Sequence, residues 1–331
     1  MKTRKTFIYI ALILLPLLVL GISLFMGRYP KPLFISLEVL KTDPLAQRLV
    51  FNLRLPRLIT AMLLGMSLSA AGGVMQMLFR NPLVEPGFLG VTQGAGFGAA
   101  LSILLFSASP LLIELNATLF AVLGLAFSYF LARRIRYGGW VLRLVLSGIA
   151  VSAIFSAGLG ILKYLADPLT KLPDIVFWLM GGLWSVEWKD LLYILPVVIV
   201  GLVIIFLMRW RLNLLSLSDE TAFSLGVSVG RERILMLAAS VAVTAVVVSV
   251  AGIVGWIGLI VPHLTRRLTS ANAAEFIPVS MSFGAVFAII CDDLARVLTV
   301  GEIPLGIITS LLGAVLFLLM MTNRKLRIAL R

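Results

Sequence analysis

Ionisable side chains are scarce within the long apolar stretches of this chain, so the few that occur there are the first candidates for chemistry. Asp292, Asp293 and Arg296 fall in one such stretch, and Asp292 and Arg296 are four residues apart, the spacing at which helical side chains meet. The cluster predicts either an ion pair that stabilises a helix end or a docking site for a charged partner. His263 is the only histidine and Cys291 the only cysteine, which excludes a multi-histidine or cysteine metal site and a disulfide framework within one chain.

A motif for holding nucleotide phosphates is absent. G-x-x-x-x-G-K-[ST] does not occur, and the sequence contains no Gly-Lys pair at all. Because that loop supplies the backbone amides and the lysine that bind phosphates, we expect this chain to be no ATPase and to need no cofactor of its own. An ion-coupled carrier would be expected to bury carboxylates near the middle of the membrane. Asp292 and Asp293 lie instead towards one end of their apolar stretch.

The longest polar interruption in the C-terminal half, residues 209–233, is a second candidate site. Ser216 or Ser218 can cap the first turn of a short helix there. Asp219 and Glu220 suit the positive N-terminal end of that helix, and Gly226 can end it in a left-handed conformation.

This short helix would present three apolar side chains, Leu217, Phe223 and Leu225. A helix of about one and a half turns is not stable alone in water, so it must lean on the rest of the protein or on a partner. Two segments, 219–225 and 229–233, could make such a contact, and the sequence leaves the choice between them open.

The composition is that of a polytopic membrane protein. Hydrophobic residues make up 60% of the chain, charged residues 13%, and the mean hydropathy is +1.08. A spanning helix needs roughly 20 apolar residues, and the chain has many such windows, so we expect one all-α domain over residues 1–331 in a lipid bilayer. The net charge of +13 sits mostly in short loops, as the positive-inside rule predicts, and we expect no binding of nucleic acid.

About ten transmembrane helices are expected, with both termini cytoplasmic and residues 27–55 forming an external loop. Arginine pairs flank the apolar block 234–264 on both sides, which requires an even number of crossings in a block too short for two full spans. We therefore predict one full span to about Ala251 and a short, broken return helix through Pro262 and His263. The other predicted spans are 7–26, 56–79, 88–106, 111–131, 141–165, 191–208, 276–298 and 305–321. The first of these is too long for a typical signal peptide.

Spans two to five and seven to ten, residues 56–165 and 234–322, each make four crossings and start on opposite sides. This arrangement predicts inverted-repeat-like halves. A cytoplasmic segment of about 212–233 connects to the second half.

Seven stretches together resemble the FecCD-type permeases of type II ABC importers, which carry iron-siderophores, haem and cobalamin. The resemblance runs from about Arg54 to Thr322. The segments that match the family are LRLPR (53–57), QMLFRNPLVEPGFLGV (76–91), FWLMGGLWSVEW (177–188), LGVSVGRER (225–233), GIVGWIGLIVPHLTRRL (252–268), DDLAR (292–296) and EIPLGIITSLLGAVLFL (302–318).

The resemblance implies a homodimer in the cytoplasmic (inner) membrane. It also implies two ABC ATPase subunits that bind ATP and Mg on the cytoplasmic face, and an extracytoplasmic substrate-binding protein. The residues that match the family's ATPase-coupling segment are Ser218, Asp219, Glu220, Phe223, Leu225, Gly226 and Arg231. Those that match its exposed outer arginines, which dock the binding protein, are Arg54, Arg57 and Arg296.

The function that this predicts is the permease subunit of an ATP-driven importer of a metal chelate. Two alternatives stay open: an ion-coupled secondary transporter, and an ABC importer for another substrate such as molybdate. The sequence does not specify the chelate.

Overall fold

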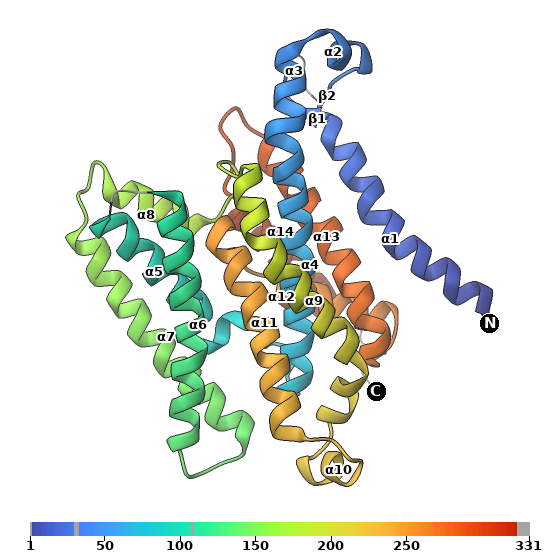
Figure 1. Ribbon diagram of the computed structural model, residues 1–331, viewed down its shortest axis with the longest axis vertical. Coiled ribbons are helices and arrows are strands. Elements are labelled where there is room, and N and C mark those ends of the chain that lie inside the picture. The colour runs from blue at the N-terminus through green and yellow to red at the C-terminus, as the bar shows by residue number, and fades with distance from the viewer. Residues whose placement is uncertain (1, 30–32, 107–108, 323–331) are drawn as a thin grey trace.

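The computed structural model describes residues 2–29, 33–106 and 109–322, which are almost entirely helical (Figure 1). The helices are α1 (Lys2–Phe25), α2 (Leu37–Thr42), α3 (Pro44–Arg48), α4 (Leu55–Leu78), α5 (Val91–Leu105), α6 (Pro110–Arg134), α7 (Trp140–Leu165), α8 (Lys171–Met180), α9 (Trp188–Leu215), α10 (Asp219–Ser224), α11 (Val229–Ala251), α12 (Ile257–Leu268), α13 (Ala273–Val297) and α14 (Leu305–Thr322). A π-helical turn (Leu49–Arg54) joins α3 to α4, and a 3-10 turn (Pro86–Leu89) precedes α5. Two short antiparallel strands, β1 (Met26–Gly27) and β2 (Leu33–Phe34), follow α1.

Seven helices of the described chain are long and apolar enough to cross a membrane by length and composition. They are Pro44–Leu78, Pro110–Arg134, Trp140–Leu165, Trp188–Leu215, Val229–Ala251, Ala273–Val297 and Leu305–Thr322. Two further apolar helices, Ile10–Phe25 and Val91–Leu105, are shorter. The prediction of an all-α polytopic membrane protein is confirmed.

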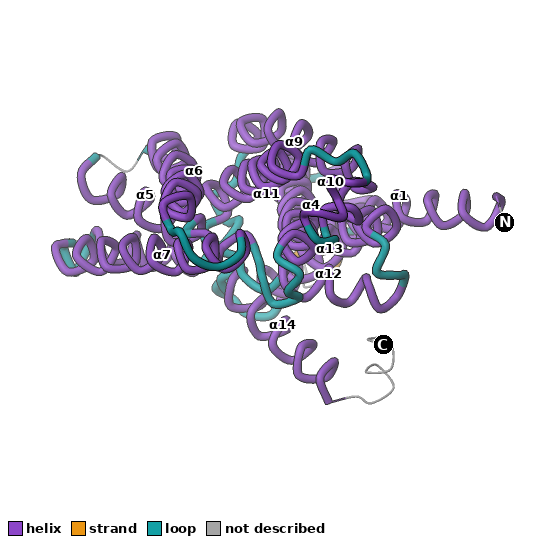
Figure 2. Tube along the Cα trace, turned by 90° about the horizontal axis from the view of Figure 1, so that it is seen from below, coloured by secondary structure: helices purple, strands orange, loops and turns teal. Residues whose placement is uncertain are grey.

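Helix α4 forms the centre of the bundle and is buried along most of its length. It packs against α9, α11, α12 and α13, while α5, α6 and α7 form a separate group that meets the centre through α11 (Figures 1 and 2). Small residues permit the closest contact. An added Cβ at Gly65 would lie 2.0 Å from the carbonyl oxygen of Gly284, so glycine is required where α4 crosses α13.

The broken return helix is present as predicted. Helix α11 ends at Ala251, and α12 runs for 12 residues from Ile257, through Pro262. Gly252 has a φ of +66°, and an added Cβ there would lie 2.2 Å from the carbonyl oxygen of Trp178. The non-helical backbone between α11 and α12 is covered by protein at Gly252 and lines a cavity at Ile253, Gly255 and Trp256, the two conditions under which it is tolerated at membrane depth.

Two predicted boundaries are wrong. Residues 27–55 are not a plain loop, because the helix of α4 extends without a break back to Pro44 through the π-helical turn. The seventh span begins earlier than the predicted residue 234, because residues 229–233 form the first turn of α11. Met1 and the basic tail 323–331 lie outside the described residues, so the placement of both termini in the cytoplasm stays a prediction.

Candidate functional sites

Helix α10 lies at one end of the bundle, between α9 and α11 (Figure 1). The Thr221 amide donates to the Ser218 hydroxyl at 3.2 Å, so Ser218 rather than Ser216 is the N-cap. Gly226 has a φ of +78° and ends the helix in the left-handed conformation that its sequence position predicts.

Two large apolar side chains are exposed on α10 and at its C-cap. Ala222 is fully buried against the bundle, whereas Phe223 is 77% and Leu225 56% exposed. Glu220 and Arg231 are also exposed. A short helix that is anchored on one side and shows two large apolar side chains on the other presents a surface suited to a protein partner.

Arg233 holds α10 to the bundle, although it is not among the site residues that the sequence predicts. Its guanidinium is buried and bonds both oxygens of Asp219, with Nη2–Oδ1 at 2.7 Å and Nη1–Oδ2 at 3.2 Å. The bonds from Arg233 lower the pKa of the Asp219 carboxyl, against a smaller opposing effect of burial. The spacing of 14 residues across a turn gives no periodic signal that could have revealed the pair.

A buried ionic cluster lies at the other end of the bundle, between α4 and α13. Asp292 is fully buried and lies 2.9 Å from Arg57 Nε and 3.0 Å from Arg296 Nε. Glu302 pairs with Arg57 at 2.8 Å, and Asp293 accepts from Arg296. The predicted pairing of Asp292 with Arg296 is therefore confirmed, and it is one of several ion pairs in the cluster.

The expectation that the three outer arginines are all exposed is wrong for two of them. Arg57 is only 8% and Arg296 only 9% exposed, because both guanidinium groups are occupied by the carboxylates of the cluster. Arg54 differs from them. It forms no ion pair among the described residues, and its buried Nη1 has no hydrogen-bond partner there. All three arginines line a hollow of about 290 Å³, and Arg54 is partly buried beside it.

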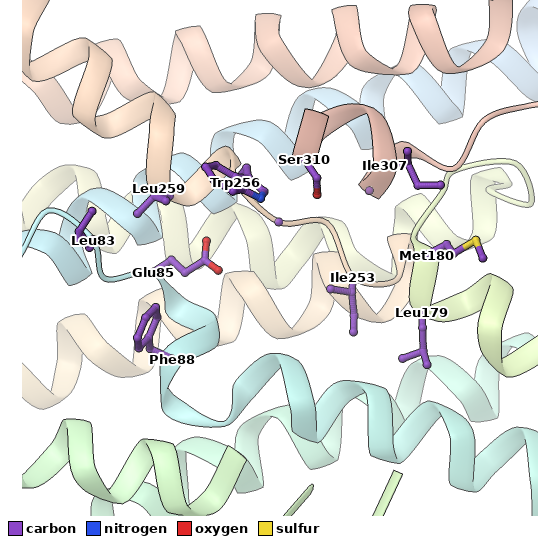
Figure 3. A pocket seen from close by; sticks show the side chains of 12 residues that line it. Leu83, Glu85, Phe88, Leu179, Met180, Ile253, Trp256, Leu259, Ile307 and Ser310 are labelled. Carbon is purple, nitrogen blue, oxygen red and sulfur yellow. The ribbon is translucent and has the colours of Figure 1, made fainter. Parts of the chain in front are cut away.

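A larger cavity of about 640 Å³ lies between the segment 83–88, the end of α8, the α11–α12 connection and the start of α14. Its walls are mostly apolar, with Phe88, Met180 and Trp256 among the largest side chains (Figure 3). The carboxylate of Glu85 points into it and has no ion-pair partner in the part of the chain that the structure describes.

Neither a metal site nor a catalytic set is apparent in the described residues. Groups of three or more histidine, cysteine or acidic side chains that could hold a metal ion are absent from them. The letters Gly226-Val227-Ser228-Val229-Gly230 match the nucleophile pattern G-x-S-x-G, but that pattern requires a turn from a strand to a helix. Here Ser228 lies between two helices, so the match is accidental.

The sequence profile of the FecCD transport family matches residues 13–323. The chain belongs to this family. The molybdate import system permease protein MolB of Haemophilus influenzae is 39% identical over 318 residues, 94% of each chain. The hemin transport system permease protein HmuU of Yersinia pestis is 38% identical over 322 residues, 95% of this chain and 94% of that one.

The fold of this FecCD protein also matches a solved structure. An inward-facing metal-chelate type ABC transporter superposes with a TM-score of 0.87 at 39% identity, covering 95% of this chain and 98% of that one. The chain is thus a membrane-spanning permease of the FecCD family. Membership was predictable from the seven stretches, whereas the roles of individual residues in the two candidate sites were not.

Proposed function

We propose that this protein is the permease subunit of an ATP-driven importer that moves a metal chelate into the cytoplasm, with ATP and Mg bound by a separate ATPase. The observation that carries the proposal is the relationship along nearly the whole chain to permeases named for a molybdate import system and a hemin transport system. The match to a metal-chelate type ABC transporter supports the cargo class. Iron-siderophores, haem and cobalamin are the chelates that we consider.

The proposed topology has ten crossings of the cytoplasmic membrane. The seven long helices together with α1, α5 and α12 make ten, and α8 and α10 lie outside the membrane. This count would place α10 in the cytoplasm and the ionic cluster on the outer side. The inverted-repeat relation between residues 56–165 and 234–322 belongs to this proposal.

Helix α10 is the proposed contact with the ATPase. Ser218 and Gly226 define its ends, Asp219 anchors it through Arg233, and Phe223 and Leu225 face outward. Glu220 and Arg231 would form the polar rim of this contact. Two ATPase subunits would serve a dimer of this chain.

The cavity of about 640 Å³ is the proposed portion of the cargo path within each copy. Its size and largely apolar walls suit an organic ligand shell around a metal. A second candidate cargo is molybdate, which the relationship to MolB favours.

Uptake by a reconstituted complex tests the proposal. The chain, its ATPase and its binding protein would be placed in proteoliposomes and supplied in turn with a ferric siderophore, haem, cobalamin and molybdate. We expect ATP-dependent accumulation of one chelate. Accumulation that follows an ion gradient in the absence of the ATPase would contradict the importer assignment, and accumulation of molybdate alone would correct the cargo.

Charge reversal at Arg54 tests the proposed docking of the binding protein. Arg57 and Arg296 already pair with carboxylates, whereas Arg54 forms no ion pair among the described residues, so Arg54 is the first of the three candidates to test. We expect Arg54→Glu to weaken docking by about tenfold at low salt and by less at high salt, since exposed charge pairs are screened.

The matched control is Arg48→Glu, at an exposed arginine of α3 that does not line the same hollow. It makes the same change in net charge and should leave the dissociation constant nearly unchanged. Equal dissociation constants for the Arg54→Glu variant and the unmodified protein would reject the role of Arg54.

A further inference from the structure

The Arg233 guanidinium has a second neighbour besides Asp219. Its Cζ lies 4.2 Å from the ring centroid of Trp140, the first residue of α7. The buried Arg233 side chain thus joins α11 to α10, through the exposed carboxylate of Asp219, and to α7, through Trp140. Burial of a charge is costly, and two bonds to the carboxylate together with the contact to the ring offset part of that cost, while the buried Nε has no hydrogen-bond partner among the described residues.

The contact continues from Trp140 to the end of the central helix. The Trp140 ring lies 5.5 Å from the ring of Phe79, which is buried and forms the C-cap of α4. A second connection runs in parallel, because the side chain of Arg80 donates to the carbonyl oxygen of Leu217 just before α10. Arg80 has a φ of +50°, which is uncommon for a residue other than glycine.

Both connections end where the wall of the large cavity begins. Phe79 and Arg80 are followed directly by the segment 81–88, from which Leu83, Glu85 and Phe88 line the cavity. Figure 3 shows these side chains on one side of the cavity, opposite the α11–α12 connection. A rotation or shift of α10 therefore has a path of packed side chains to one wall of the cavity.

We propose that Arg233 is a positioning residue that, through its stack on Trp140, transmits movement of α10 to the cavity wall at residues 81–88. This inference rests on the proposed function, in which the ATPase moves α10. It adds the route by which that movement reaches the cargo cavity. If Arg233 only tethered α10, the ion pair with Asp219 would be sufficient. Transmission of movement requires a rigid, planar guanidinium that contacts the Asp219 carboxylate and the Trp140 ring at the same time.

Arg233→Lys separates these roles. Lysine keeps the positive charge and can pair with Asp219, but it lacks the planar fork that bonds two oxygens while stacking on an indole. Trp140→Leu removes the stack from the other side and keeps an apolar side chain. The matched control is Arg211→Lys, since Arg211 is a largely exposed arginine nearby whose contact with Glu232 is longer, at 3.5 Å.

The experiment uses the complete reconstituted complex. We expect Arg233→Lys and Trp140→Leu to retain the ATPase subunits and to hydrolyse ATP, while uptake per ATP falls by about tenfold, because a contact worth about 1.4 kcal/mol would shift the balance between coupled and uncoupled arrangements by that factor. Arg211→Lys should transport as the unmodified complex does. Unchanged uptake per ATP in both Arg233→Lys and Trp140→Leu would overturn the proposal.

A labelling measurement makes the test independent of transport. In a Cys291→Ser background, Leu83→Cys reports on the cavity wall and Ser224→Cys reports on α10. Trapping of nucleotide should change maleimide labelling at both positions, and Arg233→Lys should abolish the change at residue 83 only. Persistence of the change at 83 would overturn the linkage, whereas no change at 224 in the unmodified complex would count against α10 as the ATPase contact.

Discussion

A carboxylate in place of Phe223 is expected to abolish ATP-driven uptake while leaving the permease folded. Phe223 is 77% exposed on a helix that Ser218 caps and that Ala222 and Asp219 anchor, so its ring contributes little to the fold itself. If α10 is the ATPase contact, this ring becomes buried in the complex. Burial of an unpaired carboxylate there would cost several kcal/mol, and about 1.4 kcal/mol already weakens binding tenfold.

The measurement compares Phe223→Asp with Ser224→Asp, which adds the same charge to the next residue of the same short helix. Size-exclusion chromatography should show both variants in the same oligomeric state as the unmodified protein. Uptake into proteoliposomes should be lost in the first and largely kept in the second. Equal uptake in the two would show that the exposed Phe223 ring makes no coupling contact. Leu225→Asp should resemble Phe223→Asp with a smaller effect, because Leu225 is less exposed at 56%.

Hydropathy was sufficient to predict most of the membrane helices. Each long span is an apolar run that must satisfy its own backbone in lipid, and this constraint is local. The break between Ala251 and Ile257 was also predictable, because the flanking arginines fixed an even number of crossings in a block too short for two full spans. The extension of α4 back to Pro44 was not, since mixed, proline-containing sequence resembles a loop until tertiary packing holds it as a helix.

Side-chain environments depended on contacts that no spacing encodes. Asp292 and Arg296 are one helical turn apart, and their pairing could be predicted. Arg57 is 235 residues from Asp292, so nothing in the sequence indicates that its charge is neutralised inside the protein. Arg233 is a similar case, because Trp140, which it contacts, lies on a helix that is far from it in the sequence.

Removal of the charge of Asp292 should cause the largest loss of stability of any single change in the buried ionic cluster. Asp292 is fully buried between Arg57 and Arg296, so Asp292→Asn keeps the shape and leaves two guanidinium groups without their shared counter-ion. Loss of one partner from a buried ion pair costs about 3–5 kcal/mol. For a protein of this size we expect the midpoint of thermal unfolding in detergent to fall by roughly 5–10 °C.

The control is Glu302→Gln, since Glu302 pairs with the same Arg57 at 2.8 Å but has a side chain that is 39% exposed. Water can replace that partner, and we expect a shift of at most a few degrees, as for a surface ion pair. A midpoint for Asp292→Asn no lower than that of Glu302→Gln would mean that Asp292 does not hold the cluster together.

A double variant separates a structural role of Arg57 from a docking role. Arg57→Met alone leaves Asp292 with Arg296, and Asp292→Asn alone leaves Arg57 with Glu302. The two together remove one positive and one negative charge and retain the contact between Arg296 and Asp293. Because a buried pair can be replaced by uncharged groups at little cost, the double variant should lose less stability than the sum of the single losses, by about 1–3 kcal/mol. Additive losses would mean that Arg57 and Asp292 do not interact. An Arg57→Met variant as stable as the unmodified protein would mean that Arg57 has no structural role and is free to bind a partner, as the sequence alone suggests.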